Sequence, residues 1–253
     1  MTRTYRMKVF VALVGLACGA ALSPGHAQRG GVALPPPAAS ASPAIDLTGY
    51  WVSVVTEDWK FRMVTPSPGE YGGVPLTPEG RRVADTWDPA ADKAAGEECK
   101  AYAAPAIMRV PGRFRIEWED DQTLRIDTDA GMQTRLLHFD TPAQAEPSWQ
   151  GTSHAAWEYS DSGPGGTLTV VTTSLRPGYT RWNGVPFSED ARLTEYFDLH
   201  AAPNGDEWLV VTTILEDPVY YNGPFVTSSN LKRVPDDSGW NPTPCSPGSV
   251  SIR

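Results

Sequence analysis

The chain has 253 residues, with 30 Asp and Glu against 21 Lys and Arg and a formal net charge of −9. Proteins that bind nucleic acid need a basic surface facing the phosphates, so this balance argues against a nucleic-acid partner. A hydrophobic content of 40% excludes a multi-span membrane protein, and 24 Pro, 23 Gly, 9 Trp and 9 Tyr indicate a turn-rich β fold. The length allows one or two domains.

The first 27 residues have the layout of a secretory signal peptide. Arg3, Arg6 and Lys8 form a positively charged start, residues 9–22 are apolar, and Gly25-His26-Ala27 offers a cleavage signal of small residues. The apolar run is too short to span a membrane comfortably. Cleavage would remove three cations and no acid, leaving a mature chain of net charge −12 with no integral membrane span. We therefore expect a periplasmic or secreted protein.

Two alternatives to cleavage stay open, namely a lipid anchor at Cys18 and an uncleaved signal anchor. Residues 15–17 lack the large apolar residue expected three places before a lipid-modified cysteine. This absence favours the signal peptide over the lipid anchor.

Signal-peptide removal would leave two cysteines, Cys99 and Cys245. In an oxidising compartment, two cysteines most simply form one disulfide. A redox pair or a pair of metal ligands is the alternative, but the Cys-x-x-Cys spacing of such sites is absent. The sequence therefore predicts a structural Cys99–Cys245 bridge.

The mature chain divides into a leader and one β domain. Residues 28–44 are rich in Pro, Ala and Ser without periodicity, which is typical of a flexible leader. From residue 45 to residue 253 the pattern is that of strands and tight turns, and the alternation that starts at Trp51 continues through Trp59–Met63. Apolar and polar residues alternate in three runs over 113–139, which predicts an antiparallel meander with one wet face. Further strands are expected at 153–159, 167–174, 192–200, 207–216 and 224–233.

One short peripheral helix is expected at residues 77–87. Thr77 is a good N-cap, Pro78 occupies the first helical position, and Asp88-Pro89 is expected to end the helix. Residues 88–105 are rich in Ala and acids and are expected to form a long covering loop. About ten strands and one helix favour a single antiparallel β-barrel, because closure leaves no exposed strand edges.

Several motifs add a resemblance to this prediction. Residues 47–51 resemble the Gly-x-Trp opening strand of lipocalin-like barrels, in which the Trp closes one end and the mouth takes a small ligand. A wider set, spanning roughly residues 46–245, resembles a large family of exported, functionally uncharacterised bacterial proteins. The motifs are PLTPEG at 75–80, WDP at 87–89, Cys99, GTS at 151–153, WE at 157–158, TVVTT at 169–173, NGVPFSE at 183–189, EDP at 216–218, Tyr220 and Pro224.

The resemblance implies a secreted lipocalin-like β-barrel but carries no activity. Relatives often have His where this chain has Thr152 and Phe187. If those His residues perform the family's chemistry, this chain has lost it or moved it, for example to His154.

Among the three His of the mature chain, His154 is the best catalytic candidate, whereas His138 and His200 are expected to be structural. His154 begins a strand and shares a face with Glu158. A neutral imidazole in a barrel mouth can act as a general base, with Glu158 or Glu189 fixing its tautomer. Metal-binding and nucleophile-elbow motifs are absent, so we expect neither a metal nor another cofactor.

Ligand binding is the other candidate role. Arg109 lies in an apolar context and is expected either to reach into a cavity and hold a carboxylate or to pair with a surface acid. The acidic surface disfavours anionic ligands unless Arg109, Arg176 or Arg181 points inward. Aromatic residues with polar groups often line small-molecule sites, although they equally fill barrel cores. The candidates are Trp157, Tyr159, Tyr196 and Tyr220.

Three functions follow from these residues. The leading hypothesis is binding of a small, largely apolar or aromatic molecule inside the barrel. The second is a cofactor-free isomerase, lyase or hydratase that uses His154 with a carboxylate in the cavity. The third is a structural module of the cell envelope with a filled core. The sequence leaves the ligand and the oligomeric state open.

Overall fold

The computed structural model describes residues 38–140 and 146–247. The predicted signal peptide (1–27) and the first ten residues of the predicted leader (28–37) lie outside the described residues. Within the described part of the chain, no helix has both the length and the apolar character needed to cross a membrane.

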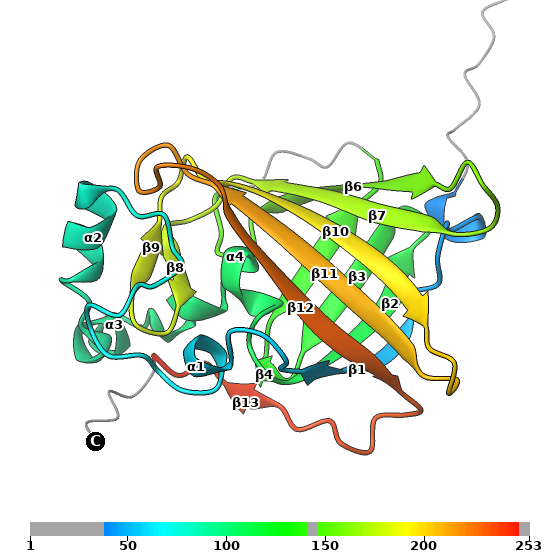
Figure 1. Cartoon of the computed structure of the whole chain (residues 1–253), viewed down its shortest axis with the longest axis horizontal. Coiled ribbons are helices and arrows are strands. Elements are labelled where there is room, and N and C mark those ends of the chain that lie inside the picture. Colours follow the sequence, from blue (N-terminus) through cyan, green and yellow to red (C-terminus); the bar gives the residue numbers. More distant parts are fainter. Residues whose placement is uncertain (1–37, 141–145, 248–253) are drawn as a thin grey trace, which may run out of the picture. The chain divides into compact units, whose positions relative to one another are not determined.

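Nine strands close into a barrel in which each strand pairs with the next one along the chain, and the last pairs with the first (Figure 1). This sequential order explains why the sequence shows strand runs separated mostly by short turns. The barrel strands are β1 (Gly49–Val54), β2 (Arg113–Asp120), β3 (Thr123–Thr128), β5 (Thr134–His138), β6 (Thr152–Tyr159), β7 (Gly166–Thr173), β10 (Arg192–Ala201), β11 (Glu207–Glu216) and β12 (Phe225–Val234).

The barrel is mixed, so the prediction of a purely antiparallel barrel is wrong. Eight neighbouring pairs are antiparallel, but β5 and β6 run parallel, with Leu137 opposite Ser153 and His138 opposite His154. The odd strand number requires this. Strands that alternate in direction around a closed ring return to the starting direction only if their number is even, so nine strands need a parallel pair.

Large apolar side chains fill the barrel interior. Trp51, Phe114 and Phe197 are buried there, and the indole Nε1 of Trp51 donates to the carbonyl oxygen of Leu47 at 2.9 Å. Inward and outward residues alternate along each strand, as the pleat requires. The first-strand Trp is therefore a core residue. The other interior apolar residues are Ile116, Leu124, Ile126, Leu137, Ala155, Leu168, Val170, Leu209, Val211 and Leu231.

The structure has more helices than the one predicted from sequence. The predicted helix exists as α2 (Pro78–Ala84), capped by Thr77, whose side chain accepts a hydrogen bond from Gly80 N. Three further α-helices are α1 (Trp59–Arg62), α3 (Pro89–Ala94) and α4 (Ala104–Ile107), and Glu98–Tyr102 forms a 3-10 helix.

Asp88-Pro89 explains one of these extra helices. The carboxylate of Asp88 accepts hydrogen bonds from Ala90 N and Ala91 N, and Pro89 occupies the first helical position. Asp and Pro at these positions begin a helix. The pair was expected to end α2 and in fact starts α3.

These helices belong to a region at one end of the barrel, which we call the cap and define as residues 55–112 and 174–191 (Figure 1). It also contains the two-stranded sheet of β8 (Gly178–Arg181) and β9 (Val185–Phe187). A second hydrophobic core joins the cap to the ends of three barrel strands. Cap residues such as Phe187 and Leu175 pack there with Leu193, Leu215 and Phe225.

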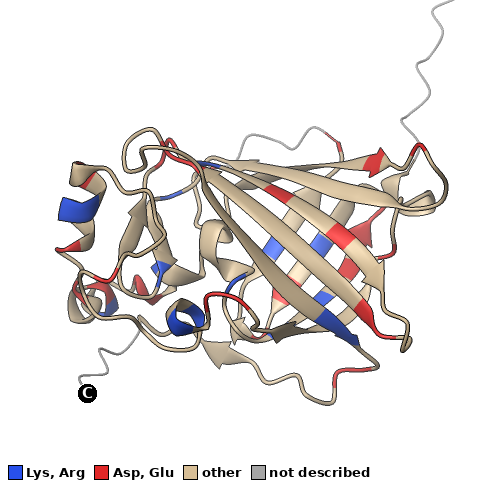
Figure 2. Ribbon diagram, viewed as in Figure 1, with Lys and Arg blue, Asp and Glu red and all other residues tan. Residues whose placement is uncertain are grey.

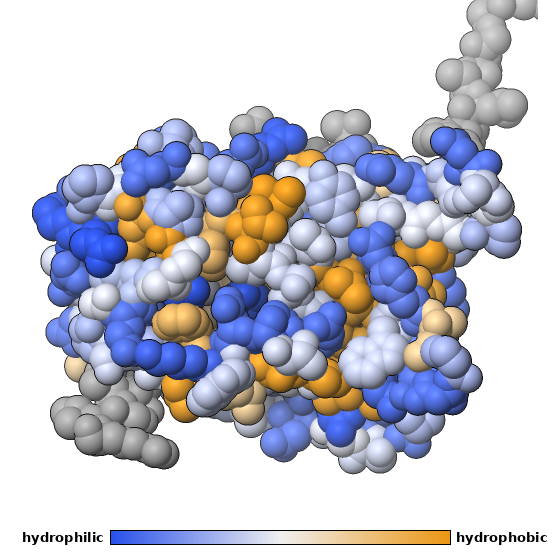
Figure 3. Space-filling model, viewed as in Figure 1, coloured by the Kyte–Doolittle hydropathy of each residue, from blue (hydrophilic) through white to orange (hydrophobic). Residues whose placement is uncertain are grey.

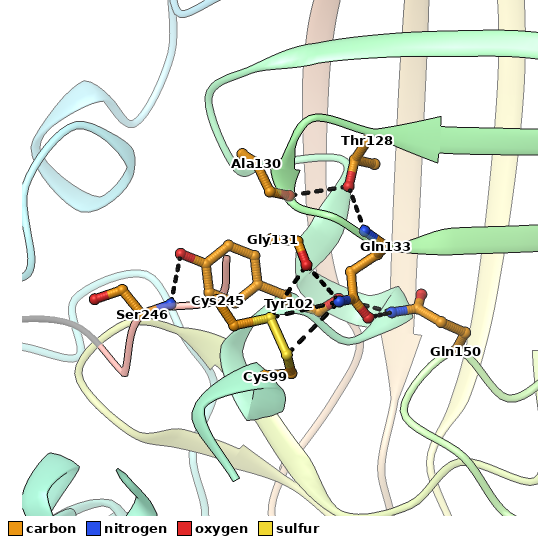
Figure 4. Close-up of a disulfide and its surroundings, with 9 residues drawn as sticks. All are labelled: Cys99, Tyr102, Thr128, Ala130, Gly131, Gln133, Gln150, Cys245 and Ser246. Carbon is orange, nitrogen blue, oxygen red and sulfur yellow. Dashed lines mark hydrogen bonds between the residues drawn. A yellow bond between two sulfur atoms is a disulfide. The ribbon is translucent and has the colours of Figure 1, made fainter. Parts of the chain in front are cut away.

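A disulfide ties the cap to the C-terminal tail, as predicted (Figure 4). Cys99 and Cys245 are bonded, and the tail strand β13 (Thr243–Pro244) pairs with β4 (Ala130–Gly131). Gly131 has a φ of 80°, and a Cβ there would lie 2.3 Å from the ring of Tyr102. A side chain at position 131 would therefore displace the ring that packs beneath the bridge.

Residues 38–44 of the predicted leader lie against β6. The Nε1 of Trp157 donates to the carbonyl of Ala39 at 3.3 Å, and the hydroxyl of Tyr159 donates to the carbonyl of Ser42 at 2.8 Å. A 3-10 helix at Ala39–Ala41 forms in this segment. Ser40 also bonds Asp121 in the turn between β2 and β3, so the last part of the leader packs at the end of the barrel opposite the cap (Figure 1).

Candidate anion-binding site

The predicted catalytic side chains do not meet in a cavity. His154 and Glu158 are exposed on the outer wall of β6, because the strand alternation turns Ser153 and Ala155 inward. Glu158 instead accepts a hydrogen bond from Thr169 on the neighbouring strand. The prediction that His154 and Glu158 share a face is confirmed, but the expected position of that face inside the barrel is wrong.

Glu189 is also exposed, at the end of the cap. Its neighbour Ser188 is the residue with a buried role. The backbone N and the hydroxyl of Ser188 donate to Asp217 at 2.6 and 2.9 Å, which fixes the turn after β11. Glu189 is therefore a solvated position beside a structural hydrogen bond, away from His154.

The predicted ligand-binding aromatic residues are dispersed as well. Trp157 is half-buried and Tyr159 is exposed, and both bind the leader as described above. Tyr196 is half-buried on β10, with its buried neighbours Glu195 and Phe197 facing inward. Tyr220 packs against the second hydrophobic core. These four residues do not line a common cavity.

Arg109 is the predicted residue that does line a cavity. It belongs to a cavity of about 20 Å³ in the cap, together with Arg62 and Arg181. The exposed fractions of the three residues are 3% for Arg62, 5% for Arg109 and 3% for Arg181. We call this set of three arginines the arginine site. Figure 2 shows blue segments at α1, after α4 and at β8, the elements that carry them.

Each arginine reaches the site from a different element. Arg62 ends α1, and Arg109 follows the turn after α4. Arg181 ends β8, where a register shift between Tyr179 and Arg181 interrupts the pairing with β9. Such a bulge re-aims side chains, and here it leaves the consecutive residues Thr180 and Arg181 both buried.

Two adjacent acids pair with this site. Glu57 forms an ion pair with Arg62, and Asp58 pairs with Arg109 at 3.0 Å. The Nε of Arg62 also donates to the carbonyl oxygen of Arg109 at 2.8 Å, which links the two segments. Asp58 has a φ of 51°, in the left-handed region that non-glycine residues rarely adopt. The turn at Asp58 thus places both carboxylates at the arginines.

The positive charge in the site exceeds the negative charge. Three guanidinium groups face two carboxylates, which leaves one positive charge in excess. Among the described residues, Nη2 of Arg62, Nη1 of Arg109 and Nε of Arg181 are buried without a hydrogen-bond partner. With the described residues Arg181 forms no ion pair, although the charge of Asp58 acts on it, and its Nη1 donates to the carbonyl of Gly72 at 2.8 Å. Buried donors of this kind need an acceptor.

Burial and mutual repulsion disfavour the charged forms of two of these arginines. Desolvation, and after it the neighbouring charge of Arg109, lower the pKa of Arg181 to about 10, although Asp58 acts in the opposite direction. Desolvation also lowers the pKa of Arg62, with Arg109 acting in the same direction and Glu57 opposing it. An added anion would relieve both costs, because it supplies the missing negative charge and acceptor atoms.

Aromatic rings provide the remaining contacts of the site. The guanidinium of Arg181 lies over the ring of Phe61, 4.0 Å from its centroid, and 5.6 Å from the centroid of Phe225. Arg109 lies 5.9 Å from the centroid of Phe225. Stacking on ring faces holds the arginines while leaving their in-plane N–H groups available.

A fourth buried arginine, in the barrel, has a different environment. Arg135 of β5 lies inside the barrel and forms a bidentate pair with Glu195 of β10, at 3.0 and 2.5 Å. Nη2 of Arg135 also lies 3.4 Å from Thr172 Oγ1, which in turn is 2.8 Å from Ser153 Oγ. One cation and one anion balance here, although Nε of Arg135 is also buried without a hydrogen-bond partner.

Two more hollows lie outside the barrel interior. One, of about 200 Å³, is lined by outward residues of β2, β3 and β5 with Trp240. The other, of about 270 Å³, follows the turn between β11 and β12. Among the described residues, no group of three or more His, Cys, Asp or Glu is placed to hold a metal ion.

Comparisons of the chain with protein-family models, with curated proteins and with solved structures find no match. The resemblance to exported barrel proteins and the predicted export therefore stay predictions. What the chain can bind has to be argued from its own site.

Sequence reasoning found Arg109 and considered Arg181, but it missed Arg62. The alternation of Trp59, Phe61 and Met63 suggested a strand, whereas these residues belong to the turn of α1. The spacing of four between Asp58 and Arg62 is typical of helical ion pairs, but the structure pairs Arg62 with Glu57 and Asp58 with Arg109, so no local pattern indicated the site.

Proposed function

We propose that the protein binds a small organic anion carrying one carboxylate, and that the arginine site holds the carboxylate. The observation that carries this proposal is the charge imbalance of three buried arginines against two acids, with unpaired N–H donors on each arginine. One monovalent anion would balance the charge. A carboxylate matches the planar guanidinium group in geometry and in charge.

The sequence predicted a ligand inside the barrel, whereas this proposal places the ligand in the cap. The barrel interior is occupied by apolar side chains and the Arg135–Glu195 pair. The sequence favoured a small, largely apolar or aromatic ligand, and this proposal replaces that expectation with a ligand that has an anionic group. Phe61, Val110 and Trp182 line the same cavity as the arginines. Periplasmic or secreted location belongs to this proposal and rests on the signal-peptide pattern.

Calorimetric titration with acetate and benzoate tests the proposal, with acetamide and benzamide as neutral controls of the same shape. We expect binding of the acids and none of the amides. Arg109→Gln should weaken binding about 10- to 100-fold, because it removes a charged hydrogen-bond donor. Arg192→Gln, at an exposed position on β10, is the matched control and should bind as the parent does.

Two results would contradict the proposal. The first is equal binding of acid and amide, which would show that charge is not recognised. The second is the absence of acid binding by a folded protein, checked by circular dichroism, across concentrations up to tens of millimolar.

A further inference from the structure

The segment that provides Arg62 also exposes three large apolar side chains. Trp59, Met63 and Val64 are exposed by 65%, 54% and 45%. Trp59 and Met63 are four residues apart across the single turn of α1, so they project to the same side. We call these three residues the α1 patch. Single exposed apolar residues are ordinary, whereas three within six residues concentrate apolar surface on one short segment.

The α1 patch adjoins the arginine site through the chain itself. Phe61 and Arg62, which line the cavity, stand between Trp59 and Met63 in the sequence. In Figure 3, tan and orange apolar atoms appear at the place that α1 occupies in Figure 1, among hydrophilic neighbours. An apolar surface thus flanks a buried cationic site.

The size of the cavity decides where the body of a ligand must lie. About 20 Å³ is close to the room needed by one ordered water, so the cavity can take the oxygen end of a carboxylate but not a whole organic molecule. Any larger apolar part has to remain outside the cavity, next to the segment that forms its wall. On that segment the exposed apolar side chains are those of the α1 patch, although none of the three lines the cavity itself.

A ligand with an anionic head and an apolar body could come from a lipid bilayer or from solution, and the charge of the whole chain distinguishes these two sources. A net charge of −9 repels the anionic surface of a lipid bilayer, which attracts basic segments. The arginine site adds only one buried positive charge in excess, which is too little to overcome the repulsion between the chain and an anionic bilayer. A single amphiphile taken from solution therefore fits the charge distribution better than a membrane.

We infer that the ligand is an amphiphilic monocarboxylate, with its carboxylate at the arginine site and an alkyl or aryl body of roughly six to ten carbons covering the α1 patch. This inference rests on the proposed function and specifies the ligand class. It predicts that affinity grows with the apolar body, whereas the head group decides whether binding occurs.

A chain-length series tests the inference by calorimetry, using acetate, butyrate, hexanoate, octanoate and decanoate, each below its micelle concentration. We expect the dissociation constant to fall about two- to fourfold per added methylene until the patch is covered. Octanol and octanamide, which carry the tail without the charge, should bind at least tenfold more weakly than octanoate.

Variants separate the head from the tail. Trp59→Ser with Met63→Ser should reduce the preference for octanoate over acetate at least tenfold and leave acetate binding unchanged. Leu136→Ser, at an exposed apolar position on β5, is the matched control and should retain the preference. Both changes replace exposed side chains, and circular dichroism would verify the fold.

The outcomes distinguish the two proposals. If no carboxylate binds, the proposed function fails. If all carboxylates bind with equal affinity, or if the double variant keeps the octanoate preference, the proposed function stands and the amphiphile inference fails. Co-flotation with vesicles of phosphatidylcholine and phosphatidylglycerol should show no association, and strong association dependent on Trp59 would overturn the assignment to a free amphiphile.

Discussion

The barrel core and the cap both bury arginine, but they satisfy it differently. Inside the barrel, Arg135 meets Glu195 in a bidentate pair that balances charge. In the cap, Arg62, Arg109 and Arg181 share two acids. Buried donors without a partner occur in both regions, on Arg135 as well as on the cap arginines, so the difference lies in the charge count. Burial of a cation is thus ambiguous by itself. The count of opposing acids distinguishes the neutral Arg135–Glu195 pair from the arginine site, which has one positive charge in excess.

The largest effect should come from breaking the balanced pair. Glu195→Gln leaves the charge of Arg135 buried without a counter-ion, so the free energy of unfolding should fall by about 3–5 kcal/mol in urea denaturation. Replacing both residues, with Arg135→Met and Glu195→Leu, should recover most of this loss. Equal losses in the single and the double variant would show that the pair is not a closed charge balance.

A substitution in the arginine site should affect ligand affinity much more than stability. Arg181→Gln removes the arginine that forms no ion pair with the described residues, so we expect the free energy of unfolding to change by less than about 1 kcal/mol, since a buried cation is expensive to retain. Affinity for octanoate should fall about 10- to 100-fold. Urea denaturation and calorimetry measure the two effects separately. A stability loss as large as that of Glu195→Gln would erase the distinction between the two regions.

Removing an acid from the site should sharpen the comparison. Asp58→Asn raises the excess positive charge and frees Arg109 from its carboxylate, so octanoate affinity should increase about three- to tenfold. Asn tolerates the left-handed backbone of this position, which keeps the turn intact. Glu79→Gln, which removes an exposed acid on α2, is the control and should leave affinity unchanged. Weaker binding in Asp58→Asn would indicate that Asp58 positions the arginines rather than competing with the ligand.

The smallest effect concerns pH. Because burial lowers the pKa of Arg181 to about 10, octanoate affinity should be constant from about pH 6 to 9 and decline above pH 10 as this guanidinium loses its proton. The effect of Arg181 on stability changes with pH in the opposite direction to its effect on affinity. Between the folded and the unfolded pKa the unfolded chain holds more protons, so the contribution of Arg181 to the free energy of unfolding rises with pH. Calorimetry at stepped pH checks the affinity, and Arg181→Gln should abolish the decline.

Strand positions were predictable because their signal is local. The predicted strand at 207–216 is β11 to the residue, and the run at 192–200 is one residue short of β10. Two-residue alternation and flanking turns determine both. The parallel contact of β5 and β6 was not predictable in the same way. It depends on the total number of barrel strands, which local patterns within single strands do not report.

The cap shows the other limit of sequence reasoning. Its helices are only four to seven residues long, too short for a helical period to be visible, and β8 and β9 are shorter than most strands. The caps Thr77 and Asp88 were the available local signals. The arginine site assembles residues about 50 to 120 positions apart, so a pattern could nominate Arg109 but could not bring Arg62 and Arg181 to it.

The disulfide divides the covalent chain into a closed ring and an open N-terminal arm. The bond between Cys99 and Cys245 closes a ring that contains eight of the nine barrel strands, while β1 and α1 lie on an open arm that precedes the ring. A single backbone nick between the two cysteines would leave both fragments joined. A nick before Cys99 would leave β1 and Arg62 attached only by noncovalent contacts, so the arm is the part of the arginine site that proteolysis could release.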